Sequence, residues 1–442
     1  MNQYLDLFNT ERTVLDAHSP AAMNARREAA AAAFSRLGFP TKRVERYRYT
    51  DVAAAFEPNY GLNLSRLRIP ANPYEAFRCD VPNLSTSVYF VVNDSFYTDA
   101  LPRVALPEGV VVTALGKADS SLWESRYTAL ADVEADAITA LNTMLAQDGL
   151  LIYVPAHVRI IRPIQIVNIM RSAVPLMANR RVMVVAEAGA EVRLLFCDHA
   201  ADDRDFLATQ VMEVFVGEGA NVEVYELEES NATCHRFANL YADVAAGGHL
   251  THATLTLTNG LTRNQTDVRL SGEGAEARLY GCAVTDGQQH VDNNTLIDHS
   301  APDCLSRELY KYVVDERSTG AFAGRVLVRQ QAQQTDSQET NANLVCTPEA
   351  RMWTQPMLEI YADDVKCSHG STVGQLNDAA LFYMQQRGID SAEARLLLKQ
   401  AFASEVINQI TLEHLRDRLH HLVEKRFRGE LTHCRDCHLC KK

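Results

Sequence analysis

A short glycine-centred motif recurs through the middle of this chain and restricts its fold more than any other feature. The copies read EAGAEVRL at Glu187–Leu194, GEGANVEV at Gly217–Val224, GEGAEARL at Gly272–Leu279 and, more weakly, AAGGHLTH at Ala245–His252. Aligning the central glycines gives spacings of 30, 29 and 26 residues along Gly189, Gly219, Gly248 and Gly274. A near-constant period of this length is typical of solenoid proteins.

Each repeat is expected to form a strand, a tight turn and a second strand. The glycine supplies the positive φ of the turn, and only a small side chain fits at the residue that follows. Because no single repeat can bury its own apolar face, the repeats must stack into a β-helix or β-solenoid. A β-sandwich also contains many short strands, but the fixed period disfavours it. The β-type runs are Leu151–Val154, Ile160–Ile169, Arg181–Val185, Val192–Phe196, Val211–Val216, Val222–Leu227, Leu255–Leu257 and Val268–Leu270.

Helical patterns flank this β region on both sides. Strong helix formers fill Pro20–Leu37, and Ala129–Ala146 also has a helical pattern. On the C-terminal side, Asp390 and Glu393 form a capping box. Helices are predicted there over Leu376–Arg387, Ser391–Ile410 and Leu412–Phe427. We therefore divide the chain into an N-terminal helical and mixed region (1–145), a β-helix core (146–370) and a C-terminal helical region with a cysteine-rich tail (371–442).

The charge balance and the apolar pattern restrict the location and the partners of the chain. Lys and Arg total 43 against 56 Asp and Glu, and the resulting net charge of −13 argues against binding to a nucleic-acid backbone. The sequence contains no run of 18 apolar residues and no pattern of a secretory signal. We therefore expect a cytoplasmic protein without nucleic-acid or membrane partners. Its ten cysteines are then expected to be thiols or metal ligands.

One segment, DDVKCSHGSTVGQ at Asp363–Gln375, places Cys367 and His369 two residues apart. In an extended strand these side chains point to the same face. A thiolate and an imidazole on one face suit iron or zinc, and they also suit a nucleophile whose thiol pKa the histidine lowers. The alternative is that Cys367 is a buried structural residue beside a surface histidine, and that neither residue binds metal or acts as a nucleophile. A structural zinc site needs four ligands, so a metal here needs ligands from elsewhere or from a partner chain.

The C-terminal tail, HCRDCHLC at His433–Cys440, is a second candidate metal site. Its three cysteines, Cys434, Cys437 and Cys440, have the spacing C-x-x-C-x-x-C, which suits a metal or an iron–sulfur cluster. Terminal segments are commonly mobile, so a tail that captures metal adventitiously is the alternative. The C-x-x-C-H pattern of c-type haem attachment is also present, but that chemistry needs export.

Motifs of common enzymes are absent from the sequence. There is no P-loop, no G-x-G-x-x-G after a strand and no G-x-S-x-G nucleophile elbow. An enzyme built on a β-helix, such as a polysaccharide lyase or an acyltransferase, needs paired carboxylates or a catalytic histidine in a groove. The hexapeptide repeat of acyltransferases is absent, and many β-helix carbohydrate enzymes are exported.

Several stretches of the chain, together with the Cys367–His369 motif, resemble one known family. The run PMLEIYADDVKCSHGSTVGQLNDAALFYMQQRGI strongly resembles the C-terminal hallmark of the SufB/SufD family, the scaffold subunits of the SUF iron–sulfur assembly machine. The C-S-H-G segment is typical of the SufD branch. The resemblance covers about residues 35–410 and rests on Gly38–Asp51, Leu141–Pro155, Leu261–Gly281, His290–Val328, Ala332–Val345 and Pro356–Ile389.

The resemblance implies a mainly β protein: a right-handed parallel β-helix flanked by N-terminal and C-terminal helical regions. It implies a non-catalytic scaffold that pairs with SufB through the end of the β-helix and docks the ATPase SufC on its C-terminal helices. In the absence of SufB, the resemblance allows the chain to form a homodimer. The cofactor implied is a nascent iron–sulfur cluster, transient and shared with SufB, and the assembly complex is also linked to reduced flavin. An autonomous metal or iron–sulfur protein that uses the tail cysteines remains the alternative.

The resemblance also implies roles for individual residues. His369 is expected at the SufB interface where the cluster forms, with Cys367 nearby, and SufB would supply the missing ligands. The tail cysteines lie beyond the part that matches the family. Cys346 falls where the SufB branch has its cluster cysteine, but its context differs, so that role is not transferred. The predicted SufC-docking residues are Leu376, Leu381, Phe382, Ala394, Leu398 and Phe402.

Overall fold

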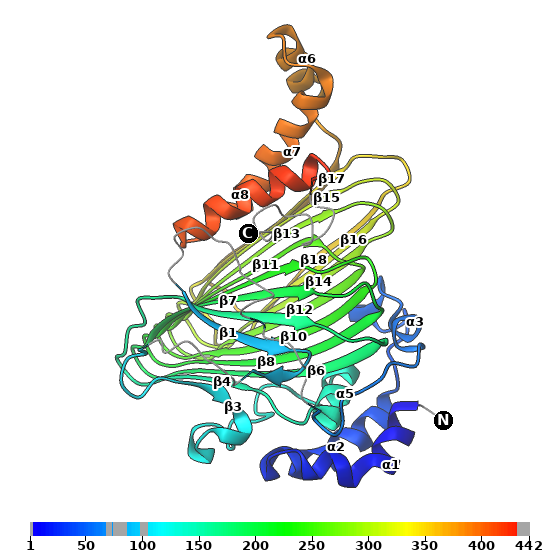
Figure 1. The fold of residues 1–442 in the computed structure, drawn as a ribbon. Helices are drawn as coiled ribbons and strands as arrows, with labels where there is room; N and C mark the ends of the chain where they lie inside the picture. The colour runs from blue at the N-terminus through cyan, green and yellow to red at the C-terminus, as the bar shows by residue number, and fades with distance from the viewer. Residues whose placement is uncertain (1–2, 68–72, 74–85, 98–104, 431–442) are drawn as a thin grey trace.

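The computed structural model describes residues 3–67, 73, 86–97 and 105–430 of the chain. Figure 1 shows strands stacked in successive layers, with helices gathered at the two ends of the sequence. The fold is mainly β, a β-solenoid of about eight turns with N-terminal and C-terminal helices. This architecture confirms the β-solenoid that the repeat spacing predicts.

Each turn of the solenoid contributes one strand to each of two facing sheets. Sheet 1 follows the order β19-β17-β15-β13-β11-β9-β7-β5-β1-β2, and sheet 2 the order β18-β16-β14-β12-β10-β8-β6-β4-β3. Pairing is parallel throughout, except between β1 and β2 and between β3 and β4. Side chains alternate between the solenoid interior and its outer faces, as the period of a strand requires.

The strand bounds follow the chain. Sheet 1 contains β1 (Ser87–Val92), β2 (Ser95–Phe96), β5 (Ile164–Met170), β7 (Glu191–Ala200), β9 (Asn221–Glu229), β11 (His249–Thr258), β13 (Glu276–Thr285), β15 (Leu305–Val314), β17 (Thr335–Val345) and β19 (Val365–Gly374). Sheet 2 contains β3 (Val111–Ala114), β4 (Leu150–Val154), β6 (Leu176–Ala186), β8 (Phe206–Val216), β10 (Cys234–Val244), β12 (Leu261–Leu270), β14 (His290–His299), β16 (Thr319–Val328) and β18 (Arg351–Ile360).

The recurring turns stack on one another as the motif predicts, with one correction. Gly189, Gly219 and Gly274 have φ values of 65°, 61° and 68°. In the weaker copy the positive φ falls on Gly247, at 59°, and not on the aligned Gly248. Gly248 occupies the position of the small residue that follows, where a Cβ would lie 3.0 Å from the Ala245 carbonyl oxygen.

The same column of turns continues where no glycine marks it. His157, Asp303 and Gln334 have φ values of 59°, 58° and 60°. Each donates its backbone N–H to the next coil, over 2.8, 2.9 and 2.7 Å respectively. These polar side chains tolerate the left-handed conformation less well than glycine, but neighbouring coils hold them there. The sequence pattern therefore fades before the solenoid ends.

The N-terminal helices cover the outer face of sheet 2. A buried apolar cluster joins them to Met177, Leu207 and Phe237 of β6, β8 and β10. The prediction of a helix from Ala129 was wrong over its first eight residues. The helix begins at Ala137, because the Asp136 side chain accepts from the Thr139 N–H and caps it. The elements are α1 (Gln3–Ala17), α2 (Ala21–Leu37), η1 (Glu45–Tyr47), α3 (Val52–Phe56), η2 (Leu115–Lys117), η3 (Ser120–Leu122) and α5 (Ala137–Leu145).

The C-terminal helices α6 (Asp378–Gln386), α7 (Ser391–Ile407) and α8 (Glu413–Phe427) agree with the predicted helices to within a few residues. The Asp390 side chain caps α7 by accepting from the Ala392 and Glu393 N–H groups. Only this half of the predicted capping box is formed, because the Glu393 carboxylate pairs with Arg428. Helices α7 and α8 share an apolar cluster with the outer face of sheet 1, whereas α6 projects away from the strands (Figure 1).

The solenoid ends on an uncovered coil made of β18 and β19. Within the described residues, β18 pairs only with β16 and β19 pairs only with β17. Most side chains of β19 are exposed. No helix among the described residues is long and apolar enough to span a bilayer. The division of the chain at residues 145 and 370 stays a prediction.

Candidate functional site

The Cys367–His369 motif lies on β19, the last strand of sheet 1. Both side chains lie on the face of β19 that turns toward the solenoid interior. Cys367 is half-buried and packs beside Val326 and Val328 of β16, whereas His369 is exposed. The structure therefore brings the two predicted residues together on one face, at the uncovered end. Their roles stay predictions.

The Cys367 thiol is not activated in this arrangement. Burial raises the pKa of Cys367. A hydrogen bond from the Ser337 backbone lowers this pKa, but by less than burial raises it. A raised pKa keeps the sulfur protonated, so it is a poor nucleophile at neutral pH. The geometry therefore gives no support to the nucleophile alternative. The thiol needs an incoming metal ion, or a partner's positive charge, to become a thiolate ligand.

Two rows of polar side chains lead through the interior to this motif. In the first row, Ser306 and Ser337 precede Cys367 in register on β15, β17 and β19. The Ser306 hydroxyl donates to the Ser337 hydroxyl over 2.8 Å and lies 2.9 Å from the imidazole of His299. The second row, from Glu308 through Glu339 to His369, is in register on the same three strands.

Glu308 and Glu339 are the least expected members of these rows. Their side chains are buried in the interior, where the Oε2 of Glu308 accepts a hydrogen bond from Thr295 over 2.7 Å. Burial raises the pKa of Glu308 to about 7. Burial, followed by the Glu308 carboxyl, raises the pKa of Glu339 to about 9. Sequence reasoning missed this pair because a glutamate in a strand is expected on the outer face.

Deeper in the solenoid, charged interior side chains form ion pairs with one another. Arg236 forms ion pairs with Glu226 and Asp198, and the latter also binds Arg180. His252 lies 3.0 Å from Glu226. Although burial opposes it, the Arg236 guanidinium together with His252 lowers the pKa of Glu226 to about 2. These contacts hold the middle of the solenoid together and leave its charges matched.

The tail cysteines Cys434, Cys437 and Cys440 lie outside the described residues. Within the described ranges, no group of three or more His, Cys, Asp or Glu side chains is arranged to hold a metal ion. The cysteines of the middle strands, Cys197, Cys234 and Cys282, are buried and packed with apolar neighbours. They are small core residues there.

The predicted docking residues differ in how they are placed. Phe382 on α6 is 62% exposed, whereas Leu381 and Ala394 are buried. Leu376, Leu398 and Phe402 are half-buried, and the Lys311 ammonium lies 4.2 Å from the centre of the Phe402 ring. Part of the predicted docking face is therefore used within the chain, and Phe382 is its most exposed member. Docking itself stays a prediction.

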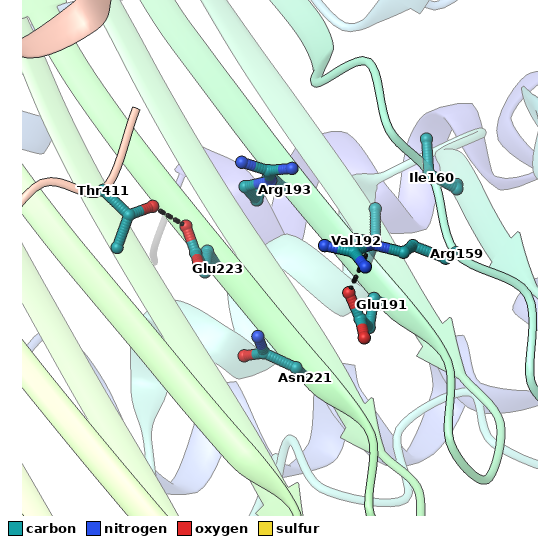
Figure 2. A pocket seen from close by; sticks show the side chains of 8 residues that line it. All are labelled: Arg159, Ile160, Glu191, Val192, Arg193, Asn221, Glu223 and Thr411. Carbon is teal, nitrogen blue, oxygen red and sulfur yellow. Dashed lines mark hydrogen bonds and ion pairs between the residues drawn. The ribbon is translucent and has the colours of Figure 1, made fainter. Parts of the chain in front are cut away.

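A separate open pocket of about 150 Å³ lies on the outer face of sheet 1 (Figure 2). Arg159 pairs with Glu191 there, and Glu223 accepts from Thr411 on the loop before α8. The two arginines and two glutamates balance, and none of the lining residues is aromatic: Arg159, Ile160, Glu191, Val192, Arg193, Asn221, Glu223 and Thr411. This volume is below the usual range for small-molecule sites, and the lining offers no ring on which a flavin could stack.

Comparison with known families matches both halves of the chain. The family model "SufBD protein N-terminal region" matches residues 1–166. The model "SUF system FeS cluster assembly, SufBD core domain" matches residues 168–402. These two matches leave residue 167 and residues 403–442 unmatched, and the latter include the end of α7 and all of α8.

Curated relatives match over most of their length. An iron–sulfur cluster assembly SufBD family protein of Synechocystis is 27% identical over 415 residues, 91% of this chain and 90% of the relative. The iron–sulfur cluster assembly protein SufD of Escherichia coli is 29% identical over 403 residues, 89% of this chain and 90% of the relative. SufD of Bacillus subtilis is 24% identical over 296 residues, 66% and 68% of the two chains.

Proposed function

This chain belongs to the SufBD family of SUF iron–sulfur cluster assembly proteins, and we propose that it is the non-catalytic scaffold subunit of a cytoplasmic complex with a SufB-like and a SufC-like protein. The observation that carries the proposal is the uncovered coil of β18 and β19. It presents Cys367 and His369 beside an edge whose backbone groups have no strand partner among the described residues. Such an edge is a ready surface for another β-structured subunit.

The proposed pairing places the nascent cluster at the junction between the two subunits. Cys367 and His369 supply one thiol and one imidazole, which are fewer ligands than an iron–sulfur cluster takes from protein. The SufB-like partner would supply the rest. The cluster is then a transient product shared across the interface, not a resident cofactor of this chain. Reduced flavin, if the complex uses it, would bind elsewhere in the assembly.

The C-terminal helices are the proposed site of ATPase docking. Helix α6 stands clear of the solenoid (Figure 1), and its Phe382 and Tyr383 side chains are exposed. Helices α7 and α8 are anchored on the outer face of sheet 1 through one apolar cluster. Movement of a docked ATPase would therefore be transmitted to the strands beneath these helices, as far as β15, which lies two strands from β19.

Co-purification tests this proposal directly. The tagged chain is purified anaerobically with its cognate SufB-like and SufC-like proteins, and the subunit ratio is measured by native mass spectrometry. We expect one copy of this chain, one SufB-like subunit and two SufC-like subunits. A chain that purifies alone from cells expressing all three proteins contradicts the proposal and favours an autonomous metal function of the tail cysteines.

A further inference from the structure

The interior carboxyls Glu308 and Glu339 lack the partners that buried carboxyls need. Their residues are 3% and 1% exposed. Both carboxyl oxygens of Glu339 and the Oε1 of Glu308 are buried without a hydrogen-bond partner. Burying a polar group without a partner costs about 1–3 kcal/mol, and more for a charge. An unsatisfied group of this kind calls for a water or an ion that completes it.

The two carboxyls also face each other. They are register partners on adjacent parallel strands, whose backbones lie about 4.8 Å apart. Glu339 reaches across the interior to sheet 2, where a Cβ on Gly324 would lie 2.0 Å from its Oε1. No ion pair joins either carboxyl to a Lys, Arg or His of the described residues. Two neighbouring carboxylate charges are unfavourable unless one carboxyl is protonated or a cation lies between them.

Two other interior carboxylates of the same solenoid receive a cation from the chain itself. Glu226 pairs with Arg236, and Asp198 pairs with Arg180. The pair near the uncovered end differs, because no Lys or Arg of the described residues forms an ion pair with it. The chain therefore supplies positive charge in the middle of the solenoid and leaves the Glu308–Glu339 pair to obtain it from outside.

We propose that Glu308 and Glu339 form a binding site for one divalent cation inside the last coils of the solenoid. Thr295 already donates to Glu308. Carboxylates, hydroxyls and water suit Mg²⁺, Mn²⁺ and Fe²⁺ better than they suit softer ions. His369 follows Glu339 in register and offers an imidazole toward the surface.

The use of this site deepens the proposed function. Ferrous iron held by Glu308 and Glu339 would lie one strand away from His369, at the place proposed for cluster assembly. That the ion is iron destined for a cluster rests on the proposed function. The existence of the cation site does not, because it depends only on the interior of this chain.

Mn²⁺ titration of the isolated chain tests the site. Mn²⁺ alone is the probe, because its electron paramagnetic resonance signal counts free ions and it binds thiolates weakly. The full-length chain carries Cys434→Ser, Cys437→Ser and Cys440→Ser, so that the tail does not compete. We expect one Mn²⁺ per chain, bound at least about tenfold more weakly in Glu339→Gln and in Glu308→Gln. The control is Glu273→Gln, an exposed turn carboxylate, which should bind Mn²⁺ as the parent does.

The outcomes are distinguishable. Glutamine copies the shape of a protonated glutamate, so we expect both variants to keep the parent melting temperature. If one of the two variants fails to fold, the Mn²⁺ affinity of the other still tests the proposed site. Absence of Mn²⁺ binding, or equal affinity in the parent and a folded variant, overturns the proposal and means that the carboxyls hold protons only. Either result leaves the co-purification test untouched, since no partner is present in the titration.

Discussion

Burial determines which single residues of this chain are chemically unusual. Cys367 and His369 are neighbours on one strand face, yet burial keeps the Cys367 thiol protonated while His369 faces solvent. Of the two side chains, the exposed imidazole of His369 is directly accessible to a metal ion, whereas the Cys367 thiol must first lose its proton. The function of the motif should therefore depend more on His369 than on Cys367.

Replacing His369 tests whether the function of the motif depends on this imidazole. His369→Ala should leave the subunit ratio of the complex unchanged and remove most of its iron and acid-labile sulfide. The matched control is Ser368→Ala, which alters the adjacent exposed residue on the opposite face of β19. Iron and sulfide are measured after anaerobic purification. Equal contents in His369→Ala and in the parent complex would reject the proposed role.

A buried glutamate in the middle of the solenoid gives a pH-dependent stability. Burial, partly offset by Arg236, raises the pKa of Glu228 from 4.5 to about 7. Because the folded state binds this proton more tightly than the unfolded state, the stabilisation is complete below about pH 4.5 and is lost as the pH rises through 7. Glu228→Gln should therefore flatten the decline in the free energy of unfolding between pH 5 and 8.

Urea unfolding measured at several pH values checks this expectation. The Ser230 and Thr262 hydroxyls donate to different oxygens of Glu228, so in the glutamine variant one hydroxyl still donates to the amide oxygen and the other accepts from the amide NH2 group. A variant whose stability falls over this pH range as steeply as that of the parent would show that Glu228 does not titrate there.

At the scale of elements, the turns explain how far the sequence reveals the fold. Glycine marks the turn at Gly189, Gly219, Gly247 and Gly274, and there the repeat is visible. At Asp303 and Gln334 the same turn forms without glycine, because stacking on neighbouring coils compensates for the backbone strain. The period of the solenoid was therefore predictable, but its full extent was not.

The candidate site was predictable only in part. The spacing of Cys367 and His369 is enough to place them on one strand face. The Glu308–Glu339 pair was not predictable, because alternation shows which residues share a face but not which face turns inward. That choice is made by the apolar residues of every coil together, so one polar residue can be carried into the interior by its neighbours.

Helix α6 offers the sharpest test of ATPase docking among the elements. Phe382→Ala should weaken binding of the SufC-like ATPase by about 1–2 kcal/mol, because exposed aromatic side chains commonly dominate such interfaces. The fold should be unaffected, since the side chain is mostly exposed. His421→Ala, at an exposed position on α8, serves as the control. Affinities are measured by isothermal titration calorimetry, and full affinity in Phe382→Ala would contradict the docking proposal.

At the scale of the whole molecule, the two ends of the solenoid differ. The first coils are covered by β1, β2 and β3 and by the N-terminal helices, whereas the coil of β18 and β19 is bare. A bare edge with few charges favours association through strand pairing. The isolated chain should therefore form a concentration-dependent homodimer through the surface that the SufB-like partner is proposed to occupy.

Val373→Lys tests this asymmetry. Val373 on β19 is 50% exposed, and a lysine there should weaken the homodimer by at least about tenfold, because an edge charge opposes strand pairing. Val174→Lys is the matched control, because Val174 is 56% exposed and lies near the other end of the solenoid. Sedimentation velocity at several concentrations measures the association. Identical behaviour of the two variants would exclude the β19 edge as the contact.

The uncovered edge of β19 also dictates how finely a partner can be positioned. Strand pairing is possible only at discrete offsets, since a slip by one residue turns every side chain to the opposite face. A slip by two residues restores the faces but moves the partner by about 6.6 Å. Any subunit that pairs with β19 therefore meets His369 in correct alignment or misses it by more than the length of a metal–ligand bond, with no intermediate position available.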